Sequence, residues 1–156
     1  MVERKGTNGV NLDDVSRSII AELQVNGRRS YAAIGKTVGL SEAAVRQRVQ
    51  KLTDAGVIQI VAVTDPLELG FARQAMIGIS VNGDIVTVAE KLAAIPEIDY
   101  LVITTGRFDM LAEIVCESDD DLLDLITGKI RALPEVTTTE TFVYLRLRKQ
   151  TYAWGV

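Results

Sequence analysis

The sequence predicts an α+β protein with a winged-helix-like helix-turn-helix domain first and a ferredoxin-like βαββαβ domain second. Before Gly56, apolar residues recur at the three- and four-residue spacing of helices, whereas β-branched runs dominate after it. Residues 94–98 (AIPEI) and 132–136 (ALPEV) each end a predicted helix and lead into a predicted strand. This internal repeat indicates that the second domain is built from two similar halves.

Three short helices are predicted in the first sixty residues. The first carries apolar residues at helical spacing from Leu12 and stops at Asn26–Gly27. The second runs from Ser30 through Val38, and Gly39 provides the turn to the third. Ser41 is placed to cap the third helix, in which three apolar residues share one face. The order and the tight turn predict a helix-turn-helix unit.

Polar side chains on the outward face of the third helix indicate binding to double-stranded DNA, because amides and guanidinium groups match base edges in the major groove. The residues predicted to contact base edges are Ala43, Arg46, Gln47 and Gln50. Those predicted to lie nearer phosphates are Ser41, Arg28, Arg29, Arg48 and Lys51. Arg48 lies on the side nearer the core, so a bracing role is its alternative. For any single residue, the alternative is a solvated face of an amphipathic helix.

Charge is divided unevenly along the chain. Residues 1–60 hold nine Lys or Arg against six Asp or Glu, whereas residues 61–156 hold eight against fifteen. The basic excess therefore lies in the part predicted to meet phosphates, and the N-terminal tail adds Arg4 and Lys5. No apolar run is long enough for a membrane span and no secretion signal opens the chain, so we expect a cytoplasmic protein that does not bind membranes.

Catalysis and metal binding have little support in the composition. The chain has no histidine and one cysteine, which removes the commonest general base and any cysteine-based zinc cluster. Cys116 stands in an apolar run and is expected to be buried and inert. Asp119, Asp120 and Asp121 are expected to open a helix, where its dipole favours negative charge. We predict no catalytic residues, no metal site and no cofactor.

The second half is predicted to alternate strands and helices. The predicted domains are residues 1–60, a hinge at 61–73 and residues 74–156, with a predicted strand at 57–63 that runs into the hinge and is interrupted by the turn residues 64–66. The predicted strands of the second domain are 75–81, 100–105, 110–117 and 138–148, and the predicted helices are 85–95 and 120–133. Both helices would cover one face of the sheet. Because the other face also carries apolar groups, we expect an obligate dimer.

Several short motifs, in order and at matching spacing, resemble the Lrp/AsnC family of regulators, also called leucine-responsive or feast/famine regulators. The resemblance covers nearly the whole chain. The motifs that carry it are Leu12-Asp13, Asn26-Gly27-Arg28, Val38-Gly39-Leu40-Ser41, Gly56-Val57-Ile58, Thr105-Gly106-Arg107-Phe108-Asp109 and Thr139-Glu140-Thr141-Phe142-Val143, with Val45, Arg48, Val49, Leu52, Asp65 and Gly70.

The resemblance implies a transcription factor whose second domain, called the RAM domain, is ACT-like and binds an amino acid or related metabolite between subunits. It further implies dimers that assemble into octamers or larger arrays. The effector-binding residues implied are Thr104, Thr105, Gly106, Arg107, Phe108, Asp109, Thr139 and Thr141. A bare Gly106 backbone can approach a ligand carboxylate, and Asp109 can accept from an α-ammonium group. Arg107 departs from the small or acidic residue usual in the family. A plain hairpin turn is the alternative for 106–109.

Three alternative functions remain. A nucleoid-associated protein would bind DNA without an effector and with little sequence preference. An amino-acid-sensing regulatory subunit would attach to an enzyme, a role in which the outward Arg46, Gln47 and Gln50 have no use. Sirohaem decarboxylase subunits share the architecture but rely on histidine, which this chain lacks.

Overall fold

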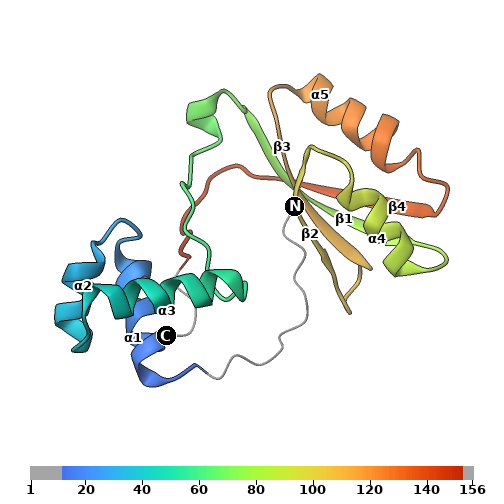
Figure 1. Ribbon diagram of the computed structural model, residues 1–156. Coiled ribbons are helices and arrows are strands. Elements are labelled where there is room, and N and C mark those ends of the chain that lie inside the picture. The colour runs from blue at the N-terminus through green and yellow to red at the C-terminus, as the bar shows by residue number, and fades with distance from the viewer. Residues whose placement is uncertain (1–11, 153–156) are drawn as a thin grey trace. The chain divides into compact units, whose positions relative to one another are not determined.

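The computed structural model describes residues 12–152, and these divide into two compact units. One unit comprises residues 12–63 together with 149–152, and the other comprises residues 64–148 (Figure 1). The N-terminal tail with Arg4 and Lys5 lies outside the described residues. No helix within residues 12–152 is both long and apolar enough to cross a membrane.

The first unit contains three helices, α1 (Asp14–Val25), α2 (Tyr31–Val38) and α3 (Glu42–Asp54). Each begins after a residue whose side chain accepts a hydrogen bond from the backbone N–H three residues on: Asp13, Ser30 and Ser41. Gly39 ends α2 with φ of 71°, a left-handed conformation that favours glycine and turns the chain toward α3. The predicted helix-turn-helix is confirmed. Its buried apolar residues are Ile19, Ile20, Leu23, Ile34, Val45, Val49 and Leu52.

The prediction of a strand at residues 57–63 is wrong for the single chain. After α3 these residues form neither helix nor strand, and Val57 and Ile58 donate backbone hydrogen bonds to the Leu52 carbonyl at 2.9 and 3.4 Å. A segment rich in β-branched residues forms a strand only when it makes ladder hydrogen bonds with a neighbouring strand. Within residues 12–152, this segment has none.

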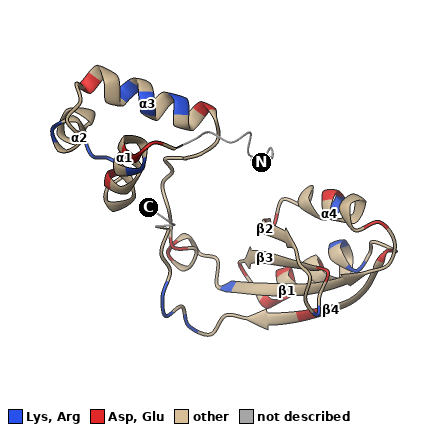
Figure 2. Ribbon diagram, turned by 90° about the horizontal axis from the view of Figure 1, so that it is seen from below, with Lys and Arg blue, Asp and Glu red and all other residues tan. Residues whose placement is uncertain are grey.

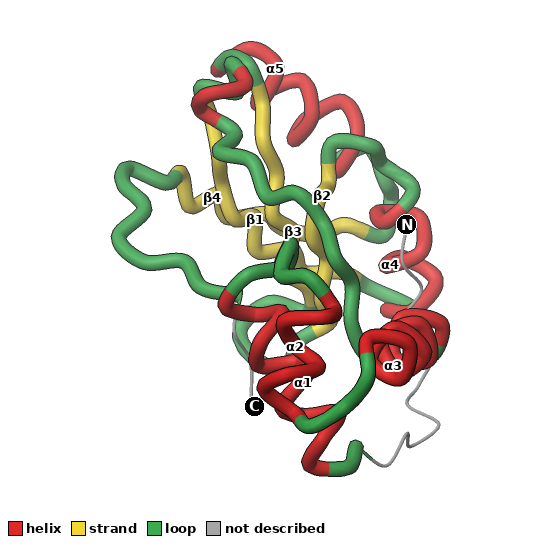
Figure 3. Tube along the Cα trace, turned by 60° about the vertical axis from the view of Figure 1, so that its left-hand side comes forward, coloured by secondary structure: helices red, strands yellow, loops and turns green. Residues whose placement is uncertain are grey.

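The second unit is a four-stranded antiparallel sheet with helices on one face (Figures 1 and 3). In chain order it contains η1 (Leu67–Leu69), β1 (Arg73–Val81), α4 (Ile85–Ala93), β2 (Ile98–Ile103), β3 (Met110–Cys116), α5 (Asp119–Asp124), η2 (Leu125–Ile130) and β4 (Val136–Val143). The strand order β2-β3-β1-β4 is that of a ferredoxin-like fold, so the predicted topology is confirmed.

The last helix and the last strand differ from the prediction. The helix predicted at 120–133 is α-helical only to Asp124 and continues as the π-helix η2. The strand predicted at 138–148 begins at Val136 and ends at Val143, which pairs with Ala75. The Tyr144 N–H donates to the Gln74 carbonyl at 2.8 Å, and β1 itself begins at Arg73. One further hydrogen bond therefore joins the chain to β1 after Val143, and residues 145–148 form neither helix nor strand.

Alternation along the strands separates a covered face from an open one. The covered face packs Ala75, Ile77, Ile79, Met110, Ala112 and Ile114 against α4, α5 and η2. Cys116 is buried on this face, which confirms its predicted burial, and burial is the main cause of its raised thiol pKa. The open face carries the side chains that alternate with these, among them Met76, Tyr100, Leu111 and Phe142.

Candidate nucleic-acid interface and effector loop

Helix α3 presents the predicted base-contacting side chains to solvent. Ala43, Arg46, Gln47 and Gln50 are all exposed, whereas Val45 on the opposite side is fully buried. Lys51 is also exposed, and Figure 2 shows basic residues along α3. The helix therefore offers amide and guanidinium groups on a surface that is free to enter a groove.

Arg46 is held in place by two neighbours. Its Nη2 lies 2.8 Å from Oε1 of Glu42, one turn earlier in α3. Its guanidinium carbon lies 5.2 Å from the ring centroid of Tyr31, the first residue of α2. The side chain of Gln50 donates a hydrogen bond from Nε2 to Oδ1 of Asp54 at 2.7 Å. The contacts with Glu42 and Tyr31 orient the exposed side chain of Arg46.

The predicted phosphate contacts fall into two groups. Arg28 and Ser41 are exposed, although the Ser41 hydroxyl accepts from the Ala44 N–H at 3.2 Å. Arg29 is half-buried and forms an ion pair with Glu22. Arg28 and Arg29 lie between α1 and α2, and Ser41 immediately precedes α3.

Arg48 joins the third helix to the start of the first. Its Nη1 donates to both carboxylate oxygens of Asp13, at 2.9 and 2.7 Å, and to the Ser16 hydroxyl at 3.1 Å. The side chain of Arg48 is 35% exposed, which leaves part of the guanidinium accessible. This geometry supports the bracing alternative for Arg48.

We expect the Asp13–Arg48 pair to make the stability of the first unit depend on pH. The Ser16 hydroxyl, the Arg48 guanidinium and the Ser16 backbone N–H lower the pKa of Asp13 to about 2. Because this folded-state pKa lies below the unfolded value of about 3.9, the stabilisation is present above that value and is lost as the pH falls toward 2. The melting temperature of an Asp13→Asn variant should therefore approach that of the wild type between pH 4 and 2.

The control for this experiment is Asp14→Asn, which removes the same charge from the next residue but no bond to Arg48. The difference between its melting temperature and that of the wild type should stay constant over the same pH range. Parallel curves for Asp13→Asn as well would contradict the assignment.

Residues 104–109 form a closed loop between β2 and β3. The Thr104 N–H donates to the Asp109 carbonyl at 2.8 Å, and the Thr104 hydroxyl donates to the Phe108 carbonyl. Asp109 accepts from the Val81 N–H through Oδ2 at 2.8 Å, which anchors the loop to the end of β1. Thr105 and Gly106 are exposed at the tip. The loop is closed by these hydrogen bonds, and the residues at its tip are exposed to solvent.

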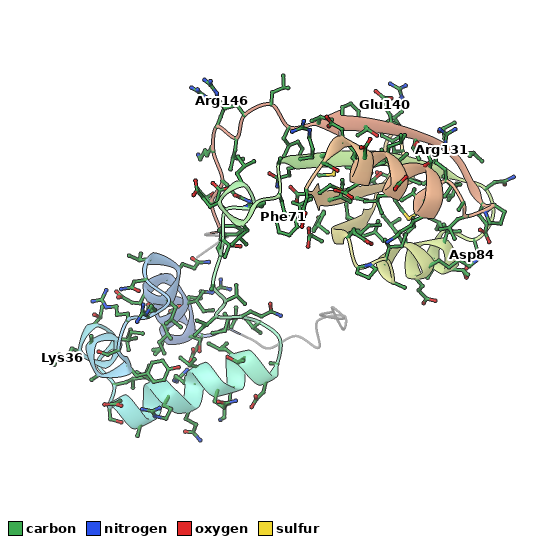
Figure 4. All side chains as sticks on the ribbon, turned by 90° about the horizontal axis from the view of Figure 1, so that it is seen from above. Lys36, Phe71, Asp84, Arg131, Glu140 and Arg146 are labelled. Carbon is green, nitrogen blue, oxygen red and sulfur yellow. The ribbon has the colours of Figure 1, made fainter. Side chains whose placement is uncertain are left out.

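The side chains of Arg107 and Phe108 meet the open face of the sheet. Arg107 Nη2 lies 3.1 Å from Glu140 Oε2, and Glu140 lies on β4 (Figure 4). The Phe108 ring packs edge-on against Phe142, with ring centroids 6.2 Å apart, and covers Gly78 of β1. The loop is therefore fastened to two strands by an ion pair and by aromatic packing.

Thr139 and Thr141 are not brought to this loop within one chain. They pair with Ile79 and Ile77, whose side chains are buried on the covered face, whereas Glu140 pairs with Gly78 on the open face. The two threonines thus lie on the opposite side of β4 from Arg107. Their assignment as effector contacts remains a prediction that requires a second subunit.

Five residues of these two regions were not predicted from the sequence. The spacing of four between Glu42 and Arg46 is a signal that could have revealed their pair. Nothing in the local sequence marks Tyr31, Gly78, Glu140 and Phe142, because each meets its partner through the tertiary fold.

A three-helix unit with exposed basic and amide side chains, joined to a ferredoxin-like unit, defines a helix-turn-helix regulator. Residues 12–53 match the AsnC-type helix-turn-helix domain. Residues 71–156 match the C-terminal dimeric alpha+beta barrel domain of AsnC-type regulators. The chain belongs to the AsnC/Lrp family of DNA-binding transcriptional regulators.

Relatives with this architecture cover nearly the whole chain. The HTH-type transcriptional regulator FL11 of Pyrococcus horikoshii is 36% identical over 144 residues, which are 91% of this chain and 95% of that protein. The regulatory protein AsnC of Escherichia coli is 30% identical over 138 residues, 86% of this chain and 91% of that protein. The structure of Escherichia coli AsnC matches with a TM-score of 0.80 and 28% identity, covering 90% of this chain and 97% of that one.

Proposed function

We propose that this regulator binds specific double-stranded DNA sites and that an amino acid or related metabolite, bound between subunits, alters that binding. The observation that carries the DNA-binding part is the exposed and pre-oriented Arg46 on α3, beside Gln47 and Gln50. In the proposal, Ala43, Arg46, Gln47 and Gln50 contact base edges. Ser41, Arg28, Arg29, Arg48 and Lys51 contact phosphates, and Arg48 also braces α1.

The proposed assembly is a homodimer formed through the open face of the sheet. Met76, Leu111 and Phe142 would otherwise expose apolar surface there. The matching family domain is dimeric, which supports a dimer through the second unit. A dimer would place two recognition helices on two half-sites. Assembly into octamers or larger arrays is part of the proposal, because the effector sites implied by the family lie between subunits.

The proposed effector site is the loop 104–109 together with Thr139 and Thr141 of another subunit. Asp109 uses Oδ2 for the Val81 N–H, so Oδ1 can accept from an α-ammonium group. The exposed backbone at Thr105 and Gly106 can donate to a carboxylate. Arg107 would meet a second carboxylate or the effector side chain once Glu140 releases it.

A fluorescence anisotropy titration tests both parts of the proposal. The protein would be titrated against the DNA upstream of its own gene with excess nonspecific competitor, and the titration repeated with each amino acid. We expect specific binding that one amino acid changes, and an Asp109→Ala variant that retains DNA affinity but loses this response. An unchanged response in Asp109→Ala would contradict the effector site.

The same titration separates the alternative functions. Binding that competitor DNA removes would favour the nucleoid-associated function, and an absence of DNA binding would favour the sensing subunit. Since its relatives are transcriptional regulators, we further propose that the chain is not an enzyme and acts in the cytoplasm, on the chromosome.

A further inference from the structure

We propose that Glu42 reads a base: its carboxylate selects cytosine at the position next to the guanine bound by Arg46, so that the two side chains act as one reading unit. This inference rests on the proposed base contact of Arg46. It adds an acidic residue to the interface. An acidic group near phosphates weakens binding unless it gains a specific contact.

The two side chains occupy the part of the recognition helix that enters the groove. Glu42 is the first residue of α3, and residues near the start of a recognition helix contact base edges. Glu42 and Arg46 are 51% and 63% exposed, and their charged ends lie 2.8 Å apart. One helical turn rises about 5.4 Å, comparable with the spacing of one to two base pairs. Two side chains one helical turn apart can therefore reach neighbouring bases.

Arg46 retains donors for guanine while it is paired with Glu42. The hydrogen bond to Glu42 uses Nη2, and a guanidinium group has five N–H donors in all. Tyr31 lies against the guanidinium, 5.2 Å from its central carbon to the ring centroid. With the fork held by a ring and a carboxylate, little further ordering is needed for a bidentate contact to guanine O6 and N7.

The carboxylate of Glu42 matches one base better than the others. An ionised carboxylate only accepts hydrogen bonds. In the major groove, guanine offers acceptors, thymine offers an acceptor and a methyl group, and adenine places the N7 acceptor beside its amino group. Cytosine offers the N4 amino donor, so it alone meets the carboxylate without a competing acceptor.

Two simpler roles would produce the same ion pair. Glu42 could stabilise the positive end of the α3 dipole, or it could act only by positioning Arg46. Neither role predicts a change in base preference at a second position of the DNA site. Base preference, rather than overall affinity, is therefore the measurement that separates the three roles.

The experiment is a selection of binding sites from random double-stranded DNA by the full-length protein. Wild type, Glu42→Gln, Glu42→Ala and Arg46→Ala would be compared, and each single-base variant of the wild-type site titrated by anisotropy. Asp14→Asn, an equal charge change at an exposed position of α1, is the matched control. We expect wild type and control to select cytosine next to guanine, and Arg46→Ala to lose the preference for guanine.

In Glu42→Ala we expect the preference for cytosine to fall by roughly five- to a hundredfold while nonspecific affinity rises. In Glu42→Gln we expect the preference to move to adenine, because an amide matches adenine N6 and N7. Preferences identical to wild type in both variants, or a loss confined to the guanine, would overturn the inference and leave Glu42 a helix-end or positioning residue. Failure of the wild type to select any sequence would instead reject the proposed function.

Discussion

An Ile34→Ala variant should lose DNA binding because its helix-turn-helix unit unfolds. Ile34 is fully buried in a small cluster with Ile19, Leu23, Val45 and Val49. Truncating such a residue costs about 2–5 kcal/mol, and a domain of this size has only a few kcal/mol of stability in all. We expect hydrogen exchange measured by mass spectrometry to show lost protection in α1, α2 and α3, with protection retained in the sheet.

The matched control is Val25→Ala, because Val25 is 84% exposed at the end of α1. Its free energy of unfolding should stay within about 0.5 kcal/mol of the wild type, with DNA affinity unchanged. Retained protection of α2 and α3 in Ile34→Ala would show that the surrounding cluster collapses around the cavity and would contradict the prediction.

A Gly78→Ala variant should displace the loop 104–109 and abolish the effector response. A methyl group at Gly78 would lie 2.5 Å from a carbon of the Phe108 ring, which covers this position of β1. The strand cannot withdraw, because β3 and β4 flank β1 in the sheet, so the ring must move and disturb its contact with Phe142. Overpacking of this kind costs about 1–3 kcal/mol, measurable by urea denaturation.

A double-mutant cycle isolates this contact. Truncating the ring as well, in Gly78→Ala/Phe108→Ala, removes the clash, so the two free-energy changes should be strongly non-additive. The control is Gly128→Ala, since no atom lies within 4 Å of a methyl group there. Additive effects of the two substitutions would show that Phe108 does not constrain Gly78.

Features that depend on neighbours in sequence were predictable. The caps Asp13, Ser30 and Ser41 act on N–H groups three residues away, and the period of the apolar residues distinguishes helices from strands. The 94–98 and 132–136 repeat supports the topology in the same way. The family motifs and the exposed face of α3 follow from the same local patterns.

Boundaries that depend on a partner were not predictable. Residues 57–63 have strand composition but no ladder, and the predicted strand 138–148 pairs with β1 only as far as Val143. A strand is defined by hydrogen bonds to another segment, so its own residues do not set its end.

Interactions between distant segments were decided only by the tertiary structure. Arg48 and Asp13 are 35 residues apart, and Arg107 meets Glu140 across the open face of the sheet. Likewise, Gly78 accommodates the Phe108 ring. The sequence by itself determined the helices, the order of strands and the family. The fold decided which charges are paired and which face of β4 each threonine occupies, because side-chain partners depend on how segments pack rather than on their own residues.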